Sequence, residues 1–160
     1  MKVGIMSDSH GNTMAIDAAL RQAGRVDHWL HAGDCISDAE YLQLASDTAV
    51  TMVAGNCDWP GTSVPGEALV ELGGHRIFLT HGHLYGVRYT IEALQEAAAE
   101  RGADVAVYGH THVADITPGA VLVLNPGSVA RPRDEALGSF LLLELSEGQV
   151  PQVKLQRVKI

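Results

Sequence analysis

Five separate segments of the chain place metal-binding side chains directly after a short apolar run. These segments carry Asp8 and His10, Asp34, Asn56, His81 and His83, and His110 and His112. They hold five of the eight histidines, although they are spread over more than a hundred positions. In open α/β sheets, ligands bind outside the carboxyl ends of the strands. We therefore predict that the five segments meet in one metal site.

The residue types indicate which metals such a site would hold. The seven candidate ligands are Asp8, His10, Asp34, Asn56, His81, His110 and His112. Carboxylates, an amide oxygen and imidazoles without a thiolate suit Mn²⁺, Fe or Zn²⁺ in a catalytic setting better than a structural zinc site. Seven ligands are too many for one tetrahedral ion, so we predict two divalent ions about 3.5–4 Å apart that share a carboxylate. Mn²⁺ is favoured, with Zn²⁺, Fe and Ni²⁺ as alternatives.

Each segment also has an ordinary structural explanation when it is taken alone. Asp8 could cap the helix that follows it, and Gly33-Asp34 could be a simple turn. Asp8 and His10 have the i, i+2 spacing that brings side chains to one face of extended backbone. A single site that explains every segment at once is favoured over five separate explanations.

The elements that must position these residues follow from the hydrophobic pattern. Strands are predicted at 3–6, 28–32, 49–54, 67–72, 75–80, 104–108, 113–117, 120–124, 139–145 and 152–159, and helices at 13–24, 38–46 and 87–101. Asn12 or Thr13 is expected to cap the first helix, and Ser37 or Asp38 the second. Strands that alternate with helices indicate parallel pairing, whereas Gly73-Gly74 indicates a hairpin. The pattern predicts an α/β fold, a four-layer α/β/β/α sandwich of two mixed β-sheets flanked by helices.

Length and composition favour an ordinary globular enzyme. The 160 residues are expected to form one domain over 1–160, with 46% hydrophobic residues and a net charge of −8. That charge disfavours non-specific nucleic-acid binding, and bound cations would have to attract an anionic substrate. No apolar run approaches the roughly 20 residues that span a bilayer, no signal peptide precedes the first strand, and two cysteines make no disulfide framework. We expect a cytoplasmic protein that does not bind membranes.

The ordered set of motifs resembles the calcineurin-like metallophosphoesterases. The resemblance rests on Asp-x-His, Gly-Asp, Gly-Asn-x-Asp, a histidine after a strand, and Gly-His-x-His, in that order. It extends from Lys2 to about Leu145. Gly-Asn-Cys-Asp, Thr-His-Gly-His and Asn-Pro-Gly-Ser…Pro-Arg are similar to the small bacterial and archaeal phosphodiesterase branch. The eukaryotic retromer subunit is similar in fold.

The resemblance implies a division of the ligands and a mechanism. It assigns Asp8, His10, Asp34 and His112 to a first metal, and Asp34, Asn56, His81 and His110 to a second, so that Asp34 bridges the two. It further implies a phosphodiesterase that hydrolyses small phosphate esters by in-line attack of a metal-bridging hydroxide. Asp34, Asn56 and His83 are the residues predicted to act in catalysis.

One departure from the family pattern concerns the proton donor. Many members have histidine after the metal-binding asparagine, where this chain has Cys57, and a thiol is a poor acid for a leaving group. His83 or a metal-bound water could supply the proton, and His83 could equally be a structural histidine beside the site. Cys57, Arg131 and Arg133 are candidate substrate contacts, although an exposed loop charge is the commoner role for each arginine.

Several nearby residues have two interpretations or a structural one. Trp59 could stack on an aromatic leaving group or pack in the core. Asp58 could hydrogen-bond a ligand histidine or form a turn. Cys35 is expected to fill the core beside Asp34, and His75 to be exposed beside the Gly73-Gly74 turn.

Other functions remain open at this point. A phosphomonoesterase, including a nucleotidase or a protein phosphatase, could use the same ligands, and a protein-binding scaffold similar to the retromer subunit could use the same fold. A small phosphoester is the expected partner in the enzyme interpretation. An exposed sheet edge could also pair two copies in a homodimer.

Overall fold

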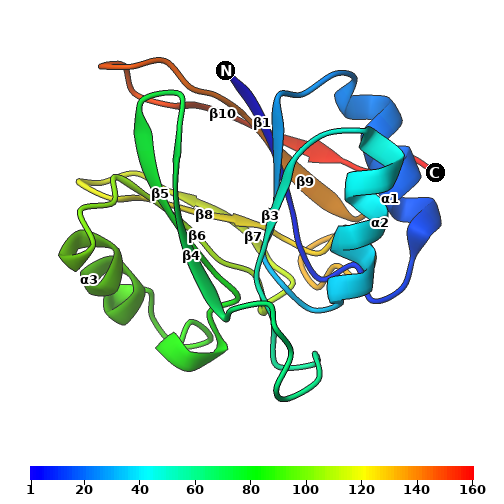
Figure 1. Ribbon diagram of the computed structural model, residues 1–160, viewed down its shortest axis with the longest axis horizontal. Helices are drawn as coiled ribbons and strands as arrows, with labels where there is room; N and C mark the ends of the chain where they lie inside the picture. Colours follow the sequence, from blue (N-terminus) through cyan, green and yellow to red (C-terminus); the bar gives the residue numbers. More distant parts are fainter.

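The computed structural model describes all 160 residues and contains two five-stranded mixed sheets (Figure 1). The first has the order β10 (Gln152–Arg157), β9 (Ser139–Glu144), β1 (Lys2–Met6), β2 (His28–His31), β3 (Val50–Met52). The second has the order β4 (Glu67–Leu72), β5 (His75–Thr80), β6 (Val105–Val107), β8 (Leu122–Pro126), β7 (Ala114–Thr117). Three adjacent strands are parallel in each sheet, β1 with β2 and β3, and β5 with β6 and β8. The remaining pairings are antiparallel.

The sheets pack face to face, and helices cover their outer faces. Alternation along β1 sends Val3 and Ile5 into the core between the sheets, whereas Met6 packs under α1 (Thr13–Ala23) and α2 (Ile36–Ser46). On β5, Phe78 packs in the opposite direction, under α3 (Glu92–Glu100). The predicted four-layer α/β/β/α sandwich is therefore confirmed (Figure 1). None of the helices is both long and apolar enough to cross a membrane.

The two helices beside the first sheet begin in different ways. The Asn12 side chain accepts a hydrogen bond from the Ala15 N–H, which is the predicted cap of α1. The prediction for α2 was wrong, because its N-cap is Cys35 and the capping oxygen comes from a distant loop. Oδ1 of Asp58 accepts the N–H groups of Cys35 and Ile36 at 3.1 and 2.9 Å. Asp58 thereby ties the loop after β3 to the start of α2.

The helix predicted at 87–101 is shorter than expected. A 3₁₀ turn, η1 (His83–Tyr85), and a turn at Gly86 precede it, and regular helix occupies only Glu92–Glu100. β-branched and aromatic residues from 87 to 91 have low helix propensity, whereas 92–100 is rich in alanine and glutamate. Leu94, Ala97 and Ala98 form the buried face of this helix.

The predicted hairpin exists, but His75 beside it is buried, contrary to expectation. Gly73 and Gly74 have φ of 56° and 83°, the left-handed values that a two-residue hairpin turn requires. Nδ1 of His75 hydrogen-bonds Oδ2 of Asp104 at 2.5 Å, and Nε2 hydrogen-bonds the Ser146 carbonyl at 2.9 Å. Burial alone would lower the pKa of His75, but these two acceptors outweigh it and raise the pKa. The ring is thus a charged link between the second sheet and the loop after β9.

We predict that His75→Gln destabilises the protein most at acidic pH. A histidine whose folded pKa is raised contributes stability that is complete below its unfolded pKa of about 6.5 and is lost as pH rises through the folded pKa. Because Asp104 is 46% exposed, we expect a loss of only about 1 kcal/mol at pH 6, which shrinks toward pH 8. Urea unfolding at several pH values measures this difference.

His28→Gln is the matched control for that measurement. Burial lowers the pKa of His28, so its replacement should show the opposite pH trend. A His75→Gln difference that grows with pH would contradict the charged link.

Candidate metal centre

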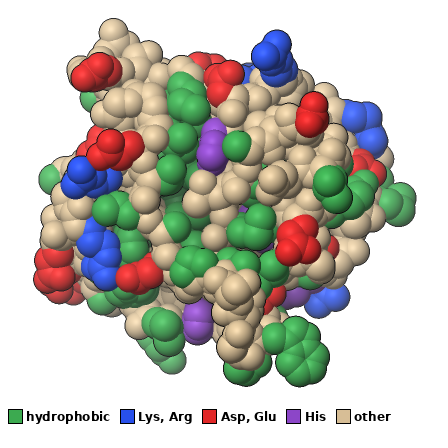
Figure 2. Space-filling view, in the orientation of Figure 1, with side chains coloured by type: hydrophobic (Ala, Val, Ile, Leu, Met, Phe, Trp, Pro, Cys, Tyr) green, Lys and Arg blue, Asp and Glu red, His purple; other side chains and the backbone are tan.

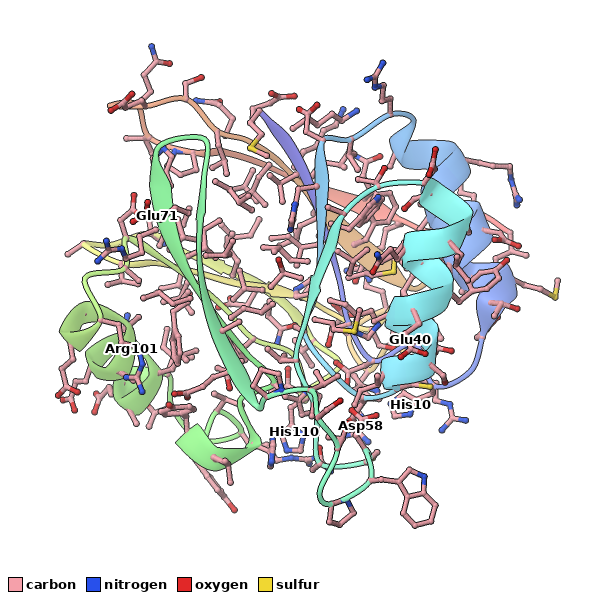
Figure 3. All side chains as sticks on the ribbon, in the orientation of Figure 1. His10, Glu40, Asp58, Glu71, Arg101 and His110 are labelled. Atoms are coloured by element: carbon pink, nitrogen blue, oxygen red, sulfur yellow. The ribbon has the colours of Figure 1, made fainter.

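The five predicted segments meet at one edge of the molecule, where the parallel strands of both sheets end. β1, β2 and β3 lead to Asp8, Asp34 and Asn56, and β5 and β6 lead to His81 and His110. Figure 3 shows His10 and His110 at this edge, on opposite sides of Asp58. The predicted metal-binding side chains are thus collected from both sheets.

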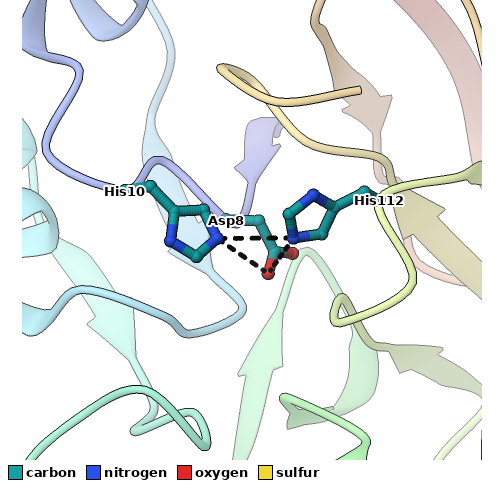
Figure 4. Close-up of side chains that lie close together, drawn as sticks. All are labelled: Asp8, His10 and His112. Carbon is teal, nitrogen blue, oxygen red and sulfur yellow. Dashed lines mark hydrogen bonds and ion pairs between the residues drawn. The ribbon is translucent and has the colours of Figure 1, made fainter. Parts of the chain in front are cut away.

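One group of side chains gathers around Oδ1 of Asp8 (Figure 4). Nε2 of His112 lies 3.3 Å from this oxygen, and Nε2 of His10 lies 3.9 Å from it. The two histidine nitrogens are 3.3 Å apart. Three ligand atoms that converge in this way match the donor set of a divalent metal site.

A second group consists of Asp8, Asp34 and His81. Oδ2 of Asp34 lies 3.3 Å from Nε2 of His81 and 3.9 Å from Nε2 of His10. Oδ1 of Asp8 is 3.9 Å from the same His81 nitrogen. Oδ2 of Asp34 therefore lies between a histidine of the first group and the histidine of the second.

Hydrogen bonds orient each carboxylate so that one oxygen remains free. Oδ2 of Asp8 accepts the Ser7 hydroxyl at 2.6 Å and the His110 N–H at 3.0 Å, and Oδ1 of Asp34 accepts the Cys57 N–H at 3.0 Å. Oδ1 of Asp8 and Nε2 of His81 are buried without any hydrogen-bond partner. Buried polar atoms are rarely left unpaired, so these two atoms, aimed at one point, fit a bound cation.

Backbone carbonyls fix two of the imidazole rings. Nδ1 of His81 donates to the Ala32 carbonyl, and Nδ1 of His112 donates to the Arg131 carbonyl, each at 2.7 Å. Each bond places a ring proton on Nδ1 and turns Nε2 toward the site. Metal-binding histidines commonly have this arrangement.

Asn56 and His110 form the outer part of the site. Nδ1 of His110 lies 3.1 Å from Oδ1 of Asn56, and its Nε2 accepts a hydrogen bond from Nε of Arg88 at 3.0 Å. Sequence reasoning missed Arg88, since it lies in a stretch predicted as helix and an exposed arginine there is unremarkable. Only the turn at Gly86 directs it toward His110.

The backbone of the site residues is left-handed, not extended. The φ angles of Asp8, His10, Asp34, His110 and His112 lie between 45° and 70°. The i, i+2 argument for Asp8 and His10 was therefore wrong in its reason, because β1 ends at Met6 and the side chains converge through turns. Non-glycine residues seldom adopt this conformation, and such strain concentrates at functional sites.

The glycines that precede His110 and Asn56 are required by close packing. A Cβ on Gly109 would lie 2.1 Å from Oγ of Ser7 and 2.7 Å from Oδ2 of Asp8. On Gly55 it would lie 2.1 Å from Oδ1 of Asp34. Because neither glycine has a positive φ, the constraint is the space beside the two carboxylates. The Gly-Asn and Gly-His motifs thus have a steric cause.

Both central carboxylates stay ionised. Burial alone would raise the pKa of Asp8, but His112, His81 and the Ser7 hydroxyl outweigh it and lower the pKa. The pKa of Asp34 is lowered against its burial by His81 and by the Cys57 N–H. The centre therefore carries two buried negative charges that a cation would neutralise.

The imidazoles divide into two classes. The nearby Asp8 carboxylate raises the pKa of His112, and Asp34 and Asp8 raise the pKa of His81 against its burial. Burial lowers the pKa of His10, and burial with the charges of His81 and Arg88 lowers that of His110 to about 4. Metal binding at His81 and His112 would thus displace protons.

A pocket of about 410 Å³ opens over these groups. Its lining residues are His10, Asp34, Asn56, Cys57, Arg88, His110, His112, Arg131, Pro132 and Arg133. The structure therefore brings the predicted substrate contacts Cys57, Arg131 and Arg133 to the site, together with Arg88. Three guanidinium groups make this pocket suited to an anion, despite the net charge of −8.

The chain is similar in sequence to known proteins. The Calcineurin-like phosphoesterase superfamily domain matches residues 1–148. The chain belongs to this superfamily. It is 36% identical over 148 residues to the Probable metallophosphoesterase YsnB of Bacillus subtilis, covering 91% of this chain and 85% of that protein. It is 31% identical over 172 residues to Phosphodiesterase YfcE of Escherichia coli, covering 90% and 88%.

A solved structure gives the same fold. The zinc complex of Vps29 from Entamoeba histolytica has a TM-score of 0.77 and 24% identity, covering 99% of this chain and 98% of that chain. At this identity the likeness concerns the fold. The predicted resemblance to calcineurin-like metallophosphoesterases and to the fold of the retromer subunit is confirmed.

Of three residues near the centre of this calcineurin-like domain, only Cys35 departs from its expected role. Asp58 forms the loop, since its Oδ2 also accepts the Gly55 N–H at 2.7 Å, and it contacts no ligand histidine. Cys35 is half-buried and lines a surface pocket, so it does not fill the core. Cys57 is exposed, and burial with the charge of Asp34 raises the pKa of its thiol, which disfavours a thiolate nucleophile.

His83 lies beside the histidines of the second group. Its ring centroid is 5.5 Å from that of His81 and 6.1 Å from that of His110, and its buried Nδ1 has no hydrogen-bond partner. Burial and the charge of His81 lower its pKa. It does not line the pocket that contains Cys57.

We predict that Gly109→Ala lowers metal affinity by at least about tenfold, because the new methyl group would displace Asp8. Inductively coupled plasma analysis of the purified protein and titration of the metal-free protein measure this loss. The matched control is Gly66→Ala, where a Cβ meets nothing within 4 Å and φ is not positive. Equal metal affinity in the two variants would contradict the steric explanation.

Proposed function

We propose that this protein is a binuclear metal-dependent phosphodiesterase that hydrolyses small phosphate esters, with Mn²⁺ as its metal. The observation that carries the proposal is the convergence of two buried unpaired atoms, Oδ1 of Asp8 and Nε2 of His81, beside Oδ2 of Asp34. Membership of the calcineurin-like superfamily and similarity to a protein named phosphodiesterase support it.

We assign the ligands to two ions. Asp8, His10, Asp34 and His112 would hold the first, and Asp34, Asn56, His81 and His110 the second. The position of Oδ2 of Asp34 between His10 and His81 supports its role as the bridge. Oxygen and imidazole donors without a thiolate suit Mn²⁺ and also accept Zn²⁺, Fe or Ni²⁺.

When bound, the two ions would supply Lewis-acid stabilisation of the phosphoryl charge and an activated water. The protein's own residues would bind and orient the ester. Arg131 and Arg133 would contact phosphoryl oxygens, and Asn56 would position the phosphoryl group beside the second ion. Asp34 would hold both ions at a fixed separation, which makes it the residue that the chemistry depends on most.

A phosphodiester is favoured over a monoester because of Cys57. A thiol with a raised pKa is a weak hydrogen-bond donor. Cys57 would therefore give little help in protonating a poor leaving group. A phosphomonoesterase, including a nucleotidase or protein phosphatase, remains the second candidate on the same ligands. A cytoplasmic location and a homodimer through a sheet edge also stay predictions.

We predict that Asp34→Asn loses at least about 100-fold in activity together with bound metal, since it removes the bridging charge. Metal content and hydrolysis of bis-p-nitrophenyl phosphate and p-nitrophenyl phosphate are measured after addition of Mn²⁺. The control is Asp47→Asn, because Asp47 has a similar left-handed φ of 50°, against 56° for Asp34, and lies at the end of α2.

Two outcomes would contradict the proposal. Faster turnover of the monoester would favour a phosphomonoesterase. A folded protein that binds Mn²⁺ but hydrolyses neither ester would favour the protein-binding scaffold.

We also propose that His83 takes part in proton transfer to the leaving group. p-Nitrophenolate leaves without a proton, whereas a nucleoside alkoxide needs one. His83→Gln should therefore slow a dinucleoside monophosphate about 100-fold and bis-p-nitrophenyl phosphate less than about fivefold. Equal losses with both substrates, measured as kcat/KM, would instead assign His83 to the positioning of His81.

A further inference from the structure

A second pocket, of about 560 Å³, lies directly beside the metal centre. It shares His10, Cys57 and Arg131 with the pocket over the metal-binding groups. Its other lining residues are Cys35, Ile36, Ser37, Glu40, Asp58, Trp59 and Thr62. A group attached to a phosphate at the metal centre would therefore reach this second pocket without crossing the protein.

One wall of the second pocket is apolar and carries an exposed indole. Trp59 is 86% exposed, whereas the other tryptophan, Trp29, is fully buried. The possibility that Trp59 packs in the core is thereby excluded. In Figure 2, hydrophobic side chains reach the surface along the lower edge, close to histidine. An exposed indole next to Ile36 and Cys57 offers a face on which a planar ring can stack.

The lining of this pocket also contains two carboxylates, those of Glu40 and Asp58. Figure 3 shows Glu40 on α2 above Asp58 and His10. Both oxygens of Asp58 are occupied by backbone N–H groups of Cys35, Ile36 and Gly55. Glu40 is exposed and has no such role, so its carboxylate is free to accept hydrogen bonds from a ligand in this pocket.

The charges of the two pockets differ in sign. Arg88, Arg131 and Arg133 line the metal pocket, whereas the lining of the second pocket has Arg131 as its only arginine or lysine beside two carboxylates. A second phosphate would be repelled by Glu40 and Asp58. An uncharged aromatic group with N–H donors fits both the indole and the carboxylate.

We propose that the second pocket binds the leaving group of the substrate, and that this group is a nucleoside. The base would stack on Trp59 and donate hydrogen bonds to Glu40, while the phosphodiester lies at the metal centre. On hydrolysis the bond from phosphorus to the nucleoside oxygen breaks, water supplies OH to phosphorus, and the nucleoside oxygen takes up the proton. This assignment rests on the proposed phosphodiesterase function.

Adenosine tests the pocket without any hydrolysis, because it carries no phosphate. Adenosine is titrated into the Mn²⁺-loaded protein, with tryptophan fluorescence as the signal, since Trp59 is the exposed one of the two tryptophans. We expect saturable quenching. Calorimetry should show at least about fivefold weaker binding in Trp59→Ala and in Glu40→Gln.

Leu84→Ala is the matched control, since Leu84 is 80% exposed but lies on η1 and does not line the pocket. Its affinity for adenosine should equal that of the unaltered protein. As a second readout, Trp59→Ala should raise KM for a dinucleoside monophosphate about fivefold or more, with kcat and the KM for bis-p-nitrophenyl phosphate changed less.

Three outcomes separate this proposal from the proposed function. Hydrolysis of diesters without saturable adenosine binding would overturn the nucleoside pocket alone. If choline binds as tightly as adenosine, and this binding is lost in Glu40→Gln, the nucleoside proposal would be overturned in favour of a cationic leaving group. Adenosine binding that requires Trp59 and Glu40 would support the pocket even in a protein that hydrolyses no phosphoester.

Discussion

Two buried carboxylates at the meeting edge of the two sheets are the constraint on which the site depends. Asp8 and Asp34 stay ionised, and Oδ1 of Asp8 has no hydrogen-bond partner. A buried charge is costly unless it is paired. His81 and His112 provide partial compensation, as their raised pKa values indicate. Bound cations would complete it, as the proposed metal centre requires.

The same constraint accounts for the local backbone. The side chains must turn sharply at the ends of their strands to face one point, which requires left-handed φ at Asp8, Asp34 and His110. The space beside the carboxylates then excludes a Cβ at Gly55 and Gly109. Strain and close packing of this kind are sustained by the rigid sheets behind them, whose inward-facing residues form one continuous apolar core.

The two pockets beside the centre are lined by different charges. The chain has a net charge of −8, yet three arginines line the pocket over the metal-binding groups. The neighbouring pocket, with Glu40 and Trp59, has the opposite preference. An ester with its phosphate in one pocket and a neutral aromatic group in the other would satisfy both preferences, and this is the basis of the proposed nucleoside leaving group.

The sequence by itself determined the four layers and the segments that meet, because period-2 and period-3.6 apolar patterns and strand-end residues are local signals. It did not determine that His75 is buried, that Asp58 caps α2, or that Arg88 contacts His110. Each of these depends on a partner 22 to 71 positions away. Tertiary packing decided them, since a side chain's partner is fixed only when distant segments are brought together.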